Sequence, residues 1–261
     1  MTRVGGPVDG VPPGAGEPTR DAEPADAGEL PREPELREDA ERARRWARLE
    51  QLEVLGDHWW WRPGWRAGRS FYTWHLTFAG APEVARLAAG WQDGIAAPGL
   101  DPVPPEWLHL TLQGVGFTDE IAAGDVVAIL AAAGERCARL RPFALTLGPA
   151  DADPEGVPLS VRPWAPVDAL RDAVRASIEQ VWGGRGVPEP ADGFRPHVTV
   201  AYSSGGTPAA PLRERLVRLR RVLPPVEITV REVSLIELRR GHQRYTWATR
   251  AVVPLGVAVP R

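Results

Sequence analysis

The chain repeats one order of predicted elements in its two halves, and this repetition most limits the folds that it can adopt. Each half contains a strand, a helix with a proline in its first turn, a Pro-rich loop and a second strand. The predicted elements are 71–78, 81–94 and 107–112 in the first half, and 157–161, 165–182 and 196–200 in the second. Related halves favour a pseudo-twofold arrangement, in which the two later strands face each other across a cleft.

The remaining apolar patterns predict further elements around this repeat. Helices are predicted at 33–55, 119–141 and 209–222, and strands at 143–147, 226–238 and 243–253. Together these elements predict an α+β protein with two related lobes.

The N-terminal part differs in composition from the rest. Residues 1–31 form an acidic tail rich in Gly and Pro, which we expect to be disordered because it holds too few apolar residues to offset the entropy of ordering. Residues 32–66 are expected to hold an N-terminal helix and a Trp-rich segment, and residues 67–261 the bilobal domain. The segment contains Trp59, Trp60, Trp61 and Trp65. It is interpreted either as a stacking surface for nucleobases or, as we favour, as a hydrophobic clamp that fastens the helix to the domain.

Composition excludes several classes of protein. The chain has no apolar run long enough for a membrane span and no apolar signal core, so a cytoplasmic location is expected. Its one cysteine, Cys137, excludes an internal disulfide and is expected to be a small core residue.

All basic residues are arginines, and residues 208–250 hold ten of them against four glutamates. This stretch fits either a polyanionic ligand or a solvated helix face.

One tetrad, His-apolar-Thr-apolar, stands on both of the later strands. It occupies residues 109–112 and 197–200. Because side chains alternate along a strand, His and Thr share one face and the aliphatics lie on the other, buried face. Two such strands brought together would place two imidazoles and two hydroxyls around one small anion. A third match at 75–78 lies on the first strand of its half and has no counterpart, so a structural role is favoured for His75 as a lone strand histidine.

In residues 105–112 (PEWLHLTL) and 194–200 (FRPHVTV), the chain resembles the 2H phosphoesterases, and among them the 2′-5′ RNA ligase-like proteins that include RNA 2′,3′-cyclic phosphodiesterases. The resemblance extends from about residue 71 to 253. It implies two lobes of antiparallel sheet with flanking helices around a central cleft. It also implies metal-free hydrolysis or transfer at a phosphodiester, often a nucleoside 2′,3′-cyclic phosphate. One departure is that no basic residue follows the second motif, and Arg195, Arg239, Arg240 and Arg244 are the candidates to replace it.

Acid–base chemistry at phosphorus assigns roles to the paired motifs. One imidazole takes the proton of the attacking water and the other protonates the leaving ribose oxygen, so His109 and His197 are the predicted catalytic pair. Thr111 and Thr199 are predicted to donate hydrogen bonds to the non-bridging phosphate oxygens. His75, Tyr202 and Arg195 are substrate-binding candidates. His58 is expected to be structural and His242 to be solvated.

The predicted ligand is an RNA end or a nucleotide that carries a cyclic phosphate. No cofactor, metal or membrane partner is expected, and the protein is expected to be a monomer. Two alternatives remain open. One is a non-catalytic module that binds nucleotide or RNA, and the other is a phosphodiesterase for a different small cyclic phosphoester.

Overall fold

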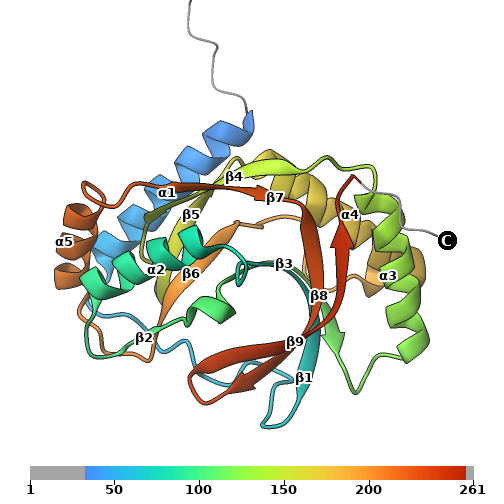
Figure 1. Cartoon of the computed structure of the whole chain (residues 1–261). Helices are drawn as coiled ribbons and strands as arrows, with labels where there is room; N and C mark the ends of the chain where they lie inside the picture. The colour runs from blue at the N-terminus through green and yellow to red at the C-terminus, as the bar shows by residue number, and fades with distance from the viewer. Residues whose placement is uncertain (1–32, 257–261) are drawn as a thin grey trace, which may run out of the picture. The chain divides into compact units, whose positions relative to one another are not determined.

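The computed structural model describes residues 33–256, in which the strands form two antiparallel sheets (Figure 1). The first sheet has the order β3 (His109–Phe117), β1 (Ser70–Thr77), β8 (Glu232–Gly241), β9 (Arg244–Pro254). The second has the order β2 (Leu100–Pro102), β6 (His197–Ser203), β5 (Gly156–Arg162), β4 (Phe143–Ala150), β7 (Val226–Val230). The predicted α+β fold with two antiparallel lobes is confirmed. The predicted tail, 1–31, lies outside the described residues.

Two of the five helices in residues 33–256 pack on the sheet that does not contain the strand before them. The helices are α1 (Glu33–Gln51), α2 (Pro82–Ile95), α3 (Ala123–Cys137), α4 (Trp164–Trp182) and α5 (Ala209–Leu219), with short 3-10 turns η1 (Pro105–Trp107) and η2 (Gly184–Gly186). The helix after β1, α2, packs on β6 and β7 of the second sheet and beside α5. The helix after β5, α4, packs on β3 of the first sheet and beside α3. Thus α2 covers the second sheet although it follows a strand of the first, and α4 covers the first sheet although it follows a strand of the second (Figure 1).

The aliphatic positions of the paired tetrads lie in the core beneath these helices. Leu110, Leu112, Val198 and Val200 are all at most 1% exposed. Burying an aliphatic side chain of this size contributes about 1.5–3 kcal/mol, so the side of each motif strand that faces the core is strongly fixed. The opposite face, which carries the His and Thr side chains, is thereby turned toward the space between the lobes.

The predicted strand 226–238 is wrong as a single element. The chain leaves the second sheet after Val230 and enters the first sheet at Glu232. Both pieces alternate apolar and polar residues, so periodicity alone does not reveal the change of sheet at Arg231. Several other boundaries also differ, two of them at the N-terminal helix and at the first motif strand. The predicted helix 33–55 ends at Gln51, and the predicted strand 107–112 starts later and runs to Phe117.

Candidate active site

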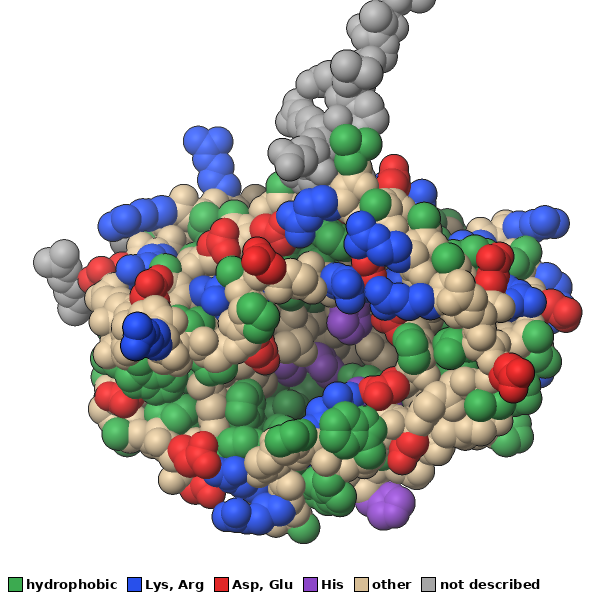
Figure 2. Space-filling model, turned by 180° about the vertical axis from the view of Figure 1, so that it is seen from behind, with side chains coloured by type: hydrophobic (Ala, Val, Ile, Leu, Met, Phe, Trp, Pro, Cys, Tyr) green, Lys and Arg blue, Asp and Glu red, His purple; other side chains and the backbone are tan. Residues whose placement is uncertain are grey.

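The two motif strands, β3 and β6, pack against each other where the sheets meet. His109 and His197 are the first residues of these strands, and both side chains are half-buried. Thr111 is exposed and Thr199 half-buried, on the same faces as their histidines. Figure 2 shows histidine side chains at the bottom of a hollow on the surface. The fold thus places the four side chains of the paired motifs on surfaces that ligands reach.

The two imidazoles are held in the same way. Nδ1 of His109 lies 2.8 Å from the carbonyl oxygen of Trp107, and Nδ1 of His197 lies 2.8 Å from that of Arg195. A carbonyl oxygen only accepts hydrogen bonds, so Nδ1 carries the proton and donates in both rings. In each ring Nε2 is then the nitrogen that can gain or lose a proton. The matching partners, each two residues back along the chain, make the pair pseudosymmetric.

The two rings are also linked electrostatically. Burial lowers the pKa of His109 to about 4; the Trp107 carbonyl opposes this shift, and the charge of His197 adds to it. Burial likewise lowers the pKa of His197, opposed by the Arg195 carbonyl, while Arg45 lowers it further. The repulsion between His109 and His197 means that protonating one ring disfavours protonating the other. A pair of this kind disfavours the doubly protonated state, and acid–base catalysis uses the state with one proton on the pair.

A β-bulge follows the threonine in both motif strands. On β3, Thr111 pairs with His75 and Gln113 with Trp74, so Leu112 is the extra residue. On β6, Thr199 pairs with Pro158 and Ala201 with Val157, so Val200 is extra. The bulge reverses the alternation beyond this point, and it places the half-buried Tyr202, rather than Ala201, on the side of Thr199. Burial raises the pKa of the Tyr202 phenol, and the neighbouring Thr199 side chain opposes this shift.

His75 lies beneath the site surface. It is 1% exposed, and its ring stacks on that of His109 with centroids 4.5 Å apart and planes 5° apart. Its Nε2 lies 3.1 Å from Oγ1 of Thr111. A side chain this deeply buried affects a ligand through Thr111 or His109 rather than by direct contact.

An open cavity of about 260 Å³, counted with space that is open to solvent, extends from His109, and four of its eleven lining residues are Trp or Tyr. Its lining includes Trp59, Trp107, Tyr202, Tyr245 and Arg244. These residues come from both sheets, from the 3-10 turn η1 and from the Trp-rich segment. The sequence did not indicate this cavity, although the position of Trp107, two residues before His109, was a signal for one of its walls.

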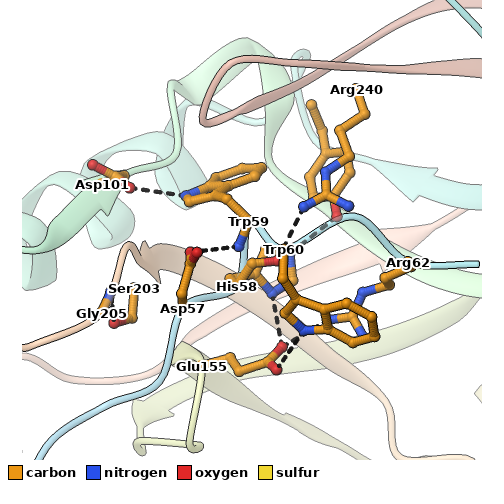
Figure 3. A network of polar contacts seen from close by, with 11 residues as sticks. Asp57, His58, Trp59, Trp60, Arg62, Asp101, Glu155, Ser203, Gly205 and Arg240 are labelled. Carbon is orange, nitrogen blue, oxygen red and sulfur yellow. Dashed lines mark hydrogen bonds and ion pairs between the residues drawn. The ribbon is translucent and has the colours of Figure 1, made fainter. Parts of the chain in front are cut away.

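The Trp-rich segment is fastened to the second lobe (Figure 3). The indole Nε1 of Trp59 donates to Asp101 at 2.9 Å, and that of Trp60 donates to Glu155 at 3.2 Å. Arg62 also donates to Glu155, at 2.7 Å. These contacts agree with a clamp, and the place of Trp59 in the cavity wall keeps the stacking interpretation open.

His58 is held among the rings of this segment and the second lobe. It stacks on Tyr202 with centroids 4.1 Å apart, and its Nε2 lies 3.0 Å from the Tyr245 hydroxyl. Burial and the Arg62 charge lower its pKa to about 4. His58 is therefore a packed neutral side chain, as expected for a structural role. His242 is exposed at the turn between β8 and β9.

The four candidate arginines differ in their surroundings. Arg195 forms an ion pair with Glu41 of α1 at 3.1 Å. Arg239 pairs with Glu237 at 3.0 Å, and the buried Arg240 donates to the carbonyl of His58 at 3.2 Å. Of the four, Arg244 is the one that lines the cavity beside His109.

A buried arginine on α4 ties the approaches to both motifs together. Arg171 is 5% exposed; it donates to the carbonyl of Leu112 at 3.0 Å and to those of Pro190 and Ala191 at 2.9 and 2.7 Å. Leu112 ends the first tetrad, and residues 190–191 belong to the loop that leads to His197. A single guanidinium thus fixes the second motif's loop to the first motif's strand.

We expect Arg171→Met to lower the free energy of unfolding by about 3 kcal/mol, because three buried carbonyls lose a charged donor. Urea denaturation followed by circular dichroism measures the change. Arg185→Met, at an exposed arginine on η2, is the matched control and should change stability by less than about 0.5 kcal/mol. Equal losses of unfolding free energy in the two variants would contradict the conclusion that Arg171 fixes the loop to the strand.

Other chemistry-bearing features of the described residues are few. Cys137 is buried at the end of α3, and burial raises the pKa of its thiol to about 11, in agreement with a core role. Within 33–256, no cluster of three or more His, Cys, Asp or Glu side chains could hold a metal ion. No helix in the same range is long and apolar enough to cross a membrane.

Comparison with known proteins identifies relatives of this chain. Residues 75–242 match the family model of the 2′-5′ RNA ligase superfamily. An RNA 2′,3′-cyclic phosphodiesterase of Thermus thermophilus is 36% identical over 123 residues, which span 43% of this chain and 59% of that relative's length. The solved structure of the Thermus thermophilus protein TT0787 superposes with a TM-score of 0.53 at 25% identity, covering 72% of this chain and 98% of the other. Escherichia coli LigT complexed with 3′-AMP gives 0.52 at 21% identity, with the same coverage.

Proposed function

This chain belongs to the 2′-5′ RNA ligase superfamily, and on that basis we propose that it is a metal-independent phosphoesterase that opens a nucleoside 2′,3′-cyclic phosphate by two-histidine acid–base catalysis. The observation that carries the proposal is the matched presentation of His109 and His197. Both donate Nδ1–H to a carbonyl, both keep Nε2 for proton exchange, and the charge of one lowers the pKa of the other.

The reaction needs two proton transfers on opposite sides of phosphorus. Water attacks in line with one ring P–O bond; a P–O bond to the water oxygen forms as the bond to the ribose oxygen breaks. One imidazole accepts the water proton at Nε2, and the other gives a proton to the ribose oxygen. The Thr111 and Thr199 hydroxyls donate to the non-bridging oxygens, where negative charge builds up. The products are a phosphomonoester and a free hydroxyl, with no net change in the number of protons on the pair.

The cavity beside His109 supports a nucleoside as the organic part of the substrate. Its walls carry Trp59, Trp107 and Tyr245, whose flat faces suit a nucleobase, and Arg244 supplies positive charge for the phosphate. The 3′-AMP in the Escherichia coli LigT structure is a ligand of this chemical class. Tyr202 also lines the cavity and lies on the same side of β6 as Thr199, so we assign it to the same subsite.

Hydrolysis of 2′,3′-cyclic AMP in the presence of EDTA, followed by ³¹P NMR, tests the proposal. We expect turnover to one phosphomonoester, and much slower turnover of cyclic glycerol phosphate, which lacks a base. Binding of 2′,3′-cyclic AMP without turnover would instead favour the non-catalytic module. Faster turnover of the base-free compound would favour a different small phosphoester.

The pH dependence of kcat/KM follows from the lowered pKa values. The productive form carries one proton on the pair, so kcat/KM falls as the pH rises through the higher apparent pKa of the free protein. Since burial lowers the pKa of both imidazoles from the ordinary 6.5, we expect the optimum to lie below pH 6.5. A pH–rate profile with 2′,3′-cyclic AMP measures it. An optimum at pH 7 or above would contradict the arrangement.

A further inference from the structure

One imidazole near the site has no part in the mechanism above. His75 of β1 lies directly opposite Thr111 in the register of the first sheet, with its Nε2 3.1 Å from the Thr111 hydroxyl oxygen. Its Nδ1 is buried and has no hydrogen-bond partner among the described residues. The side chain is 1% exposed, so it does not meet a ligand itself.

We propose that His75 is a positioning residue: its Nε2–H donates to Oγ1 of Thr111 and so directs the Thr111 hydroxyl proton toward a phosphate oxygen in the cleft. The inference rests on the proposed function, because it names what Thr111 is positioned for. It assigns to His75 an indirect role, in place of the substrate contact predicted from the sequence.

The position of the proton on His75 follows from its surroundings. Burial holds the pKa of His75 well below the ordinary 6.5, so the ring is neutral and carries one N–H. A proton on Nδ1 would leave a buried donor without an acceptor, which folded proteins almost never tolerate. A proton on Nε2 is satisfied by Thr111 and leaves only a bare lone pair on Nδ1. The Nε2–H form is therefore the favoured one.

This tautomer decides what Thr111 can do. A hydroxyl has one proton and two lone pairs. If His75 donated nothing, the Thr111 proton could turn inward to Nε2 and be lost to the ligand. With Nε2–H donating, one lone pair of Oγ1 is occupied and the hydroxyl proton must point elsewhere. Thr111 is exposed to the cleft, so the remaining direction is toward a bound anion.

The packing around His75 prevents the ring from turning away. One face stacks on His109, and the edge contact with Trp247 has a centroid separation of 5.8 Å at 85°. Trp247 also makes an edge contact with His109, at 5.3 Å and 81°. Ring rotation would have to move a catalytic imidazole and an indole together, so the donor direction is fixed before a substrate arrives.

The second lobe provides an internal control. Its threonine, Thr199, lies opposite Pro158, which has no side-chain donor. Its neighbour on the same side of β6 is Tyr202, and no imidazole lies opposite it. Of the two motif threonines, Thr111 alone faces an imidazole. Removal of the His75 side chain should therefore affect Thr111 and not Thr199.

A double-mutant cycle on 2′,3′-cyclic AMP hydrolysis tests the role. His75→Leu should lower kcat by about 10- to 100-fold with KM changed by less than about threefold, as for a misdirected transition-state donor. In a Thr111→Val background the same change should cost less than about twofold, whereas in a Thr199→Val background its full effect should remain. His75→Gln, which places an amide N–H near the former Nε2, should recover most of the loss. Equal losses in both backgrounds would mean that His75 acts through its packing on His109 or through the fold, and not through Thr111, and would overturn the proposal.

A measurement without substrate separates this inference from the proposed function. Long-range ¹H–¹⁵N NMR of histidine-labelled protein reports the tautomer of each ring, and the signal missing in His75→Gln identifies His75. The Nε2–H form is expected, and an Nδ1–H form would overturn the positioning role even if the enzyme is active. Failure of the wild type to hydrolyse 2′,3′-cyclic AMP would refute the proposed function, and the tautomer would still decide whether His75 donates to Thr111.

Discussion

Replacement of His109 or of His197 by alanine is expected to lower kcat for 2′,3′-cyclic AMP by about 10²–10⁴-fold, the usual contribution of a general acid or base. In each imidazole Nδ1–H donates to a backbone carbonyl, so Nε2 is the atom that accepts or donates the transferred proton. The two residues act as one unit, since the attack on phosphorus and the departure of the ribose oxygen belong to one displacement. The double variant should therefore lose much less than the product of the two single losses.

His242→Ala is the matched control for this experiment. His242 is exposed at the β8–β9 turn and does not line the cavity beside His109, so its removal should leave kcat within about twofold of the wild type. Steady-state and single-turnover rates are measured for the wild type, the two single variants, the double variant and His242→Ala. Thermal unfolding checks that each protein is folded. Near-normal turnover by either single alanine variant would refute the pair as the acid and base.

Replacement of Thr111 or of Thr199 by valine is expected to lower kcat by about 10²–10³-fold, the loss seen when a preorganised donor to developing charge is removed. Valine keeps the shape of threonine and its preference for strands, so the loss should not come from unfolding. KM should change little, because the hydroxyls contribute most when charge accumulates on the phosphate oxygens.

Thr229→Val separates this effect from a general effect of the substitution. Thr229 is an exposed strand threonine on β7, at the opposite edge of the second sheet from β2. It should leave kcat within about twofold of the wild type. If the variants at 111 and 199 raise KM and leave kcat unchanged, the hydroxyls contribute ground-state binding and not transition-state stabilisation.

Much of the fold could be predicted because local patterns decide it. The alternation in the two tetrads predicted which side chains are buried, and Leu110 and Val198 lie in the core as expected. Prolines marked the starts of α2 and α4, where a missing N–H costs nothing. The repeated order of elements predicted that the two motif strands face each other.

What could not be predicted depends on contacts between residues far apart in the sequence. A bulge adds one residue to a strand without a sequence signal, so the placement of Tyr202 beside Thr199 was visible only in the register. The cavity wall joins Trp59 to Tyr245, and no local pattern relates the two. The stacking of His75 beneath His109 likewise depends on neighbouring strands. Periodicity describes the face of one element and carries no information about the element that covers it.

The exchange of α2 and α4 between the lobes makes the two halves of the chain dependent on each other for folding. A polypeptide that ended before β5 would leave the back of its own sheet without α4, and α2 would have no sheet on which to pack. Synthesised apart, the halves should stay unfolded or aggregate, and together they should assemble only by mutual complementation. The native structure therefore forms late, after both halves have been synthesised, and its many distant contacts predict slow folding.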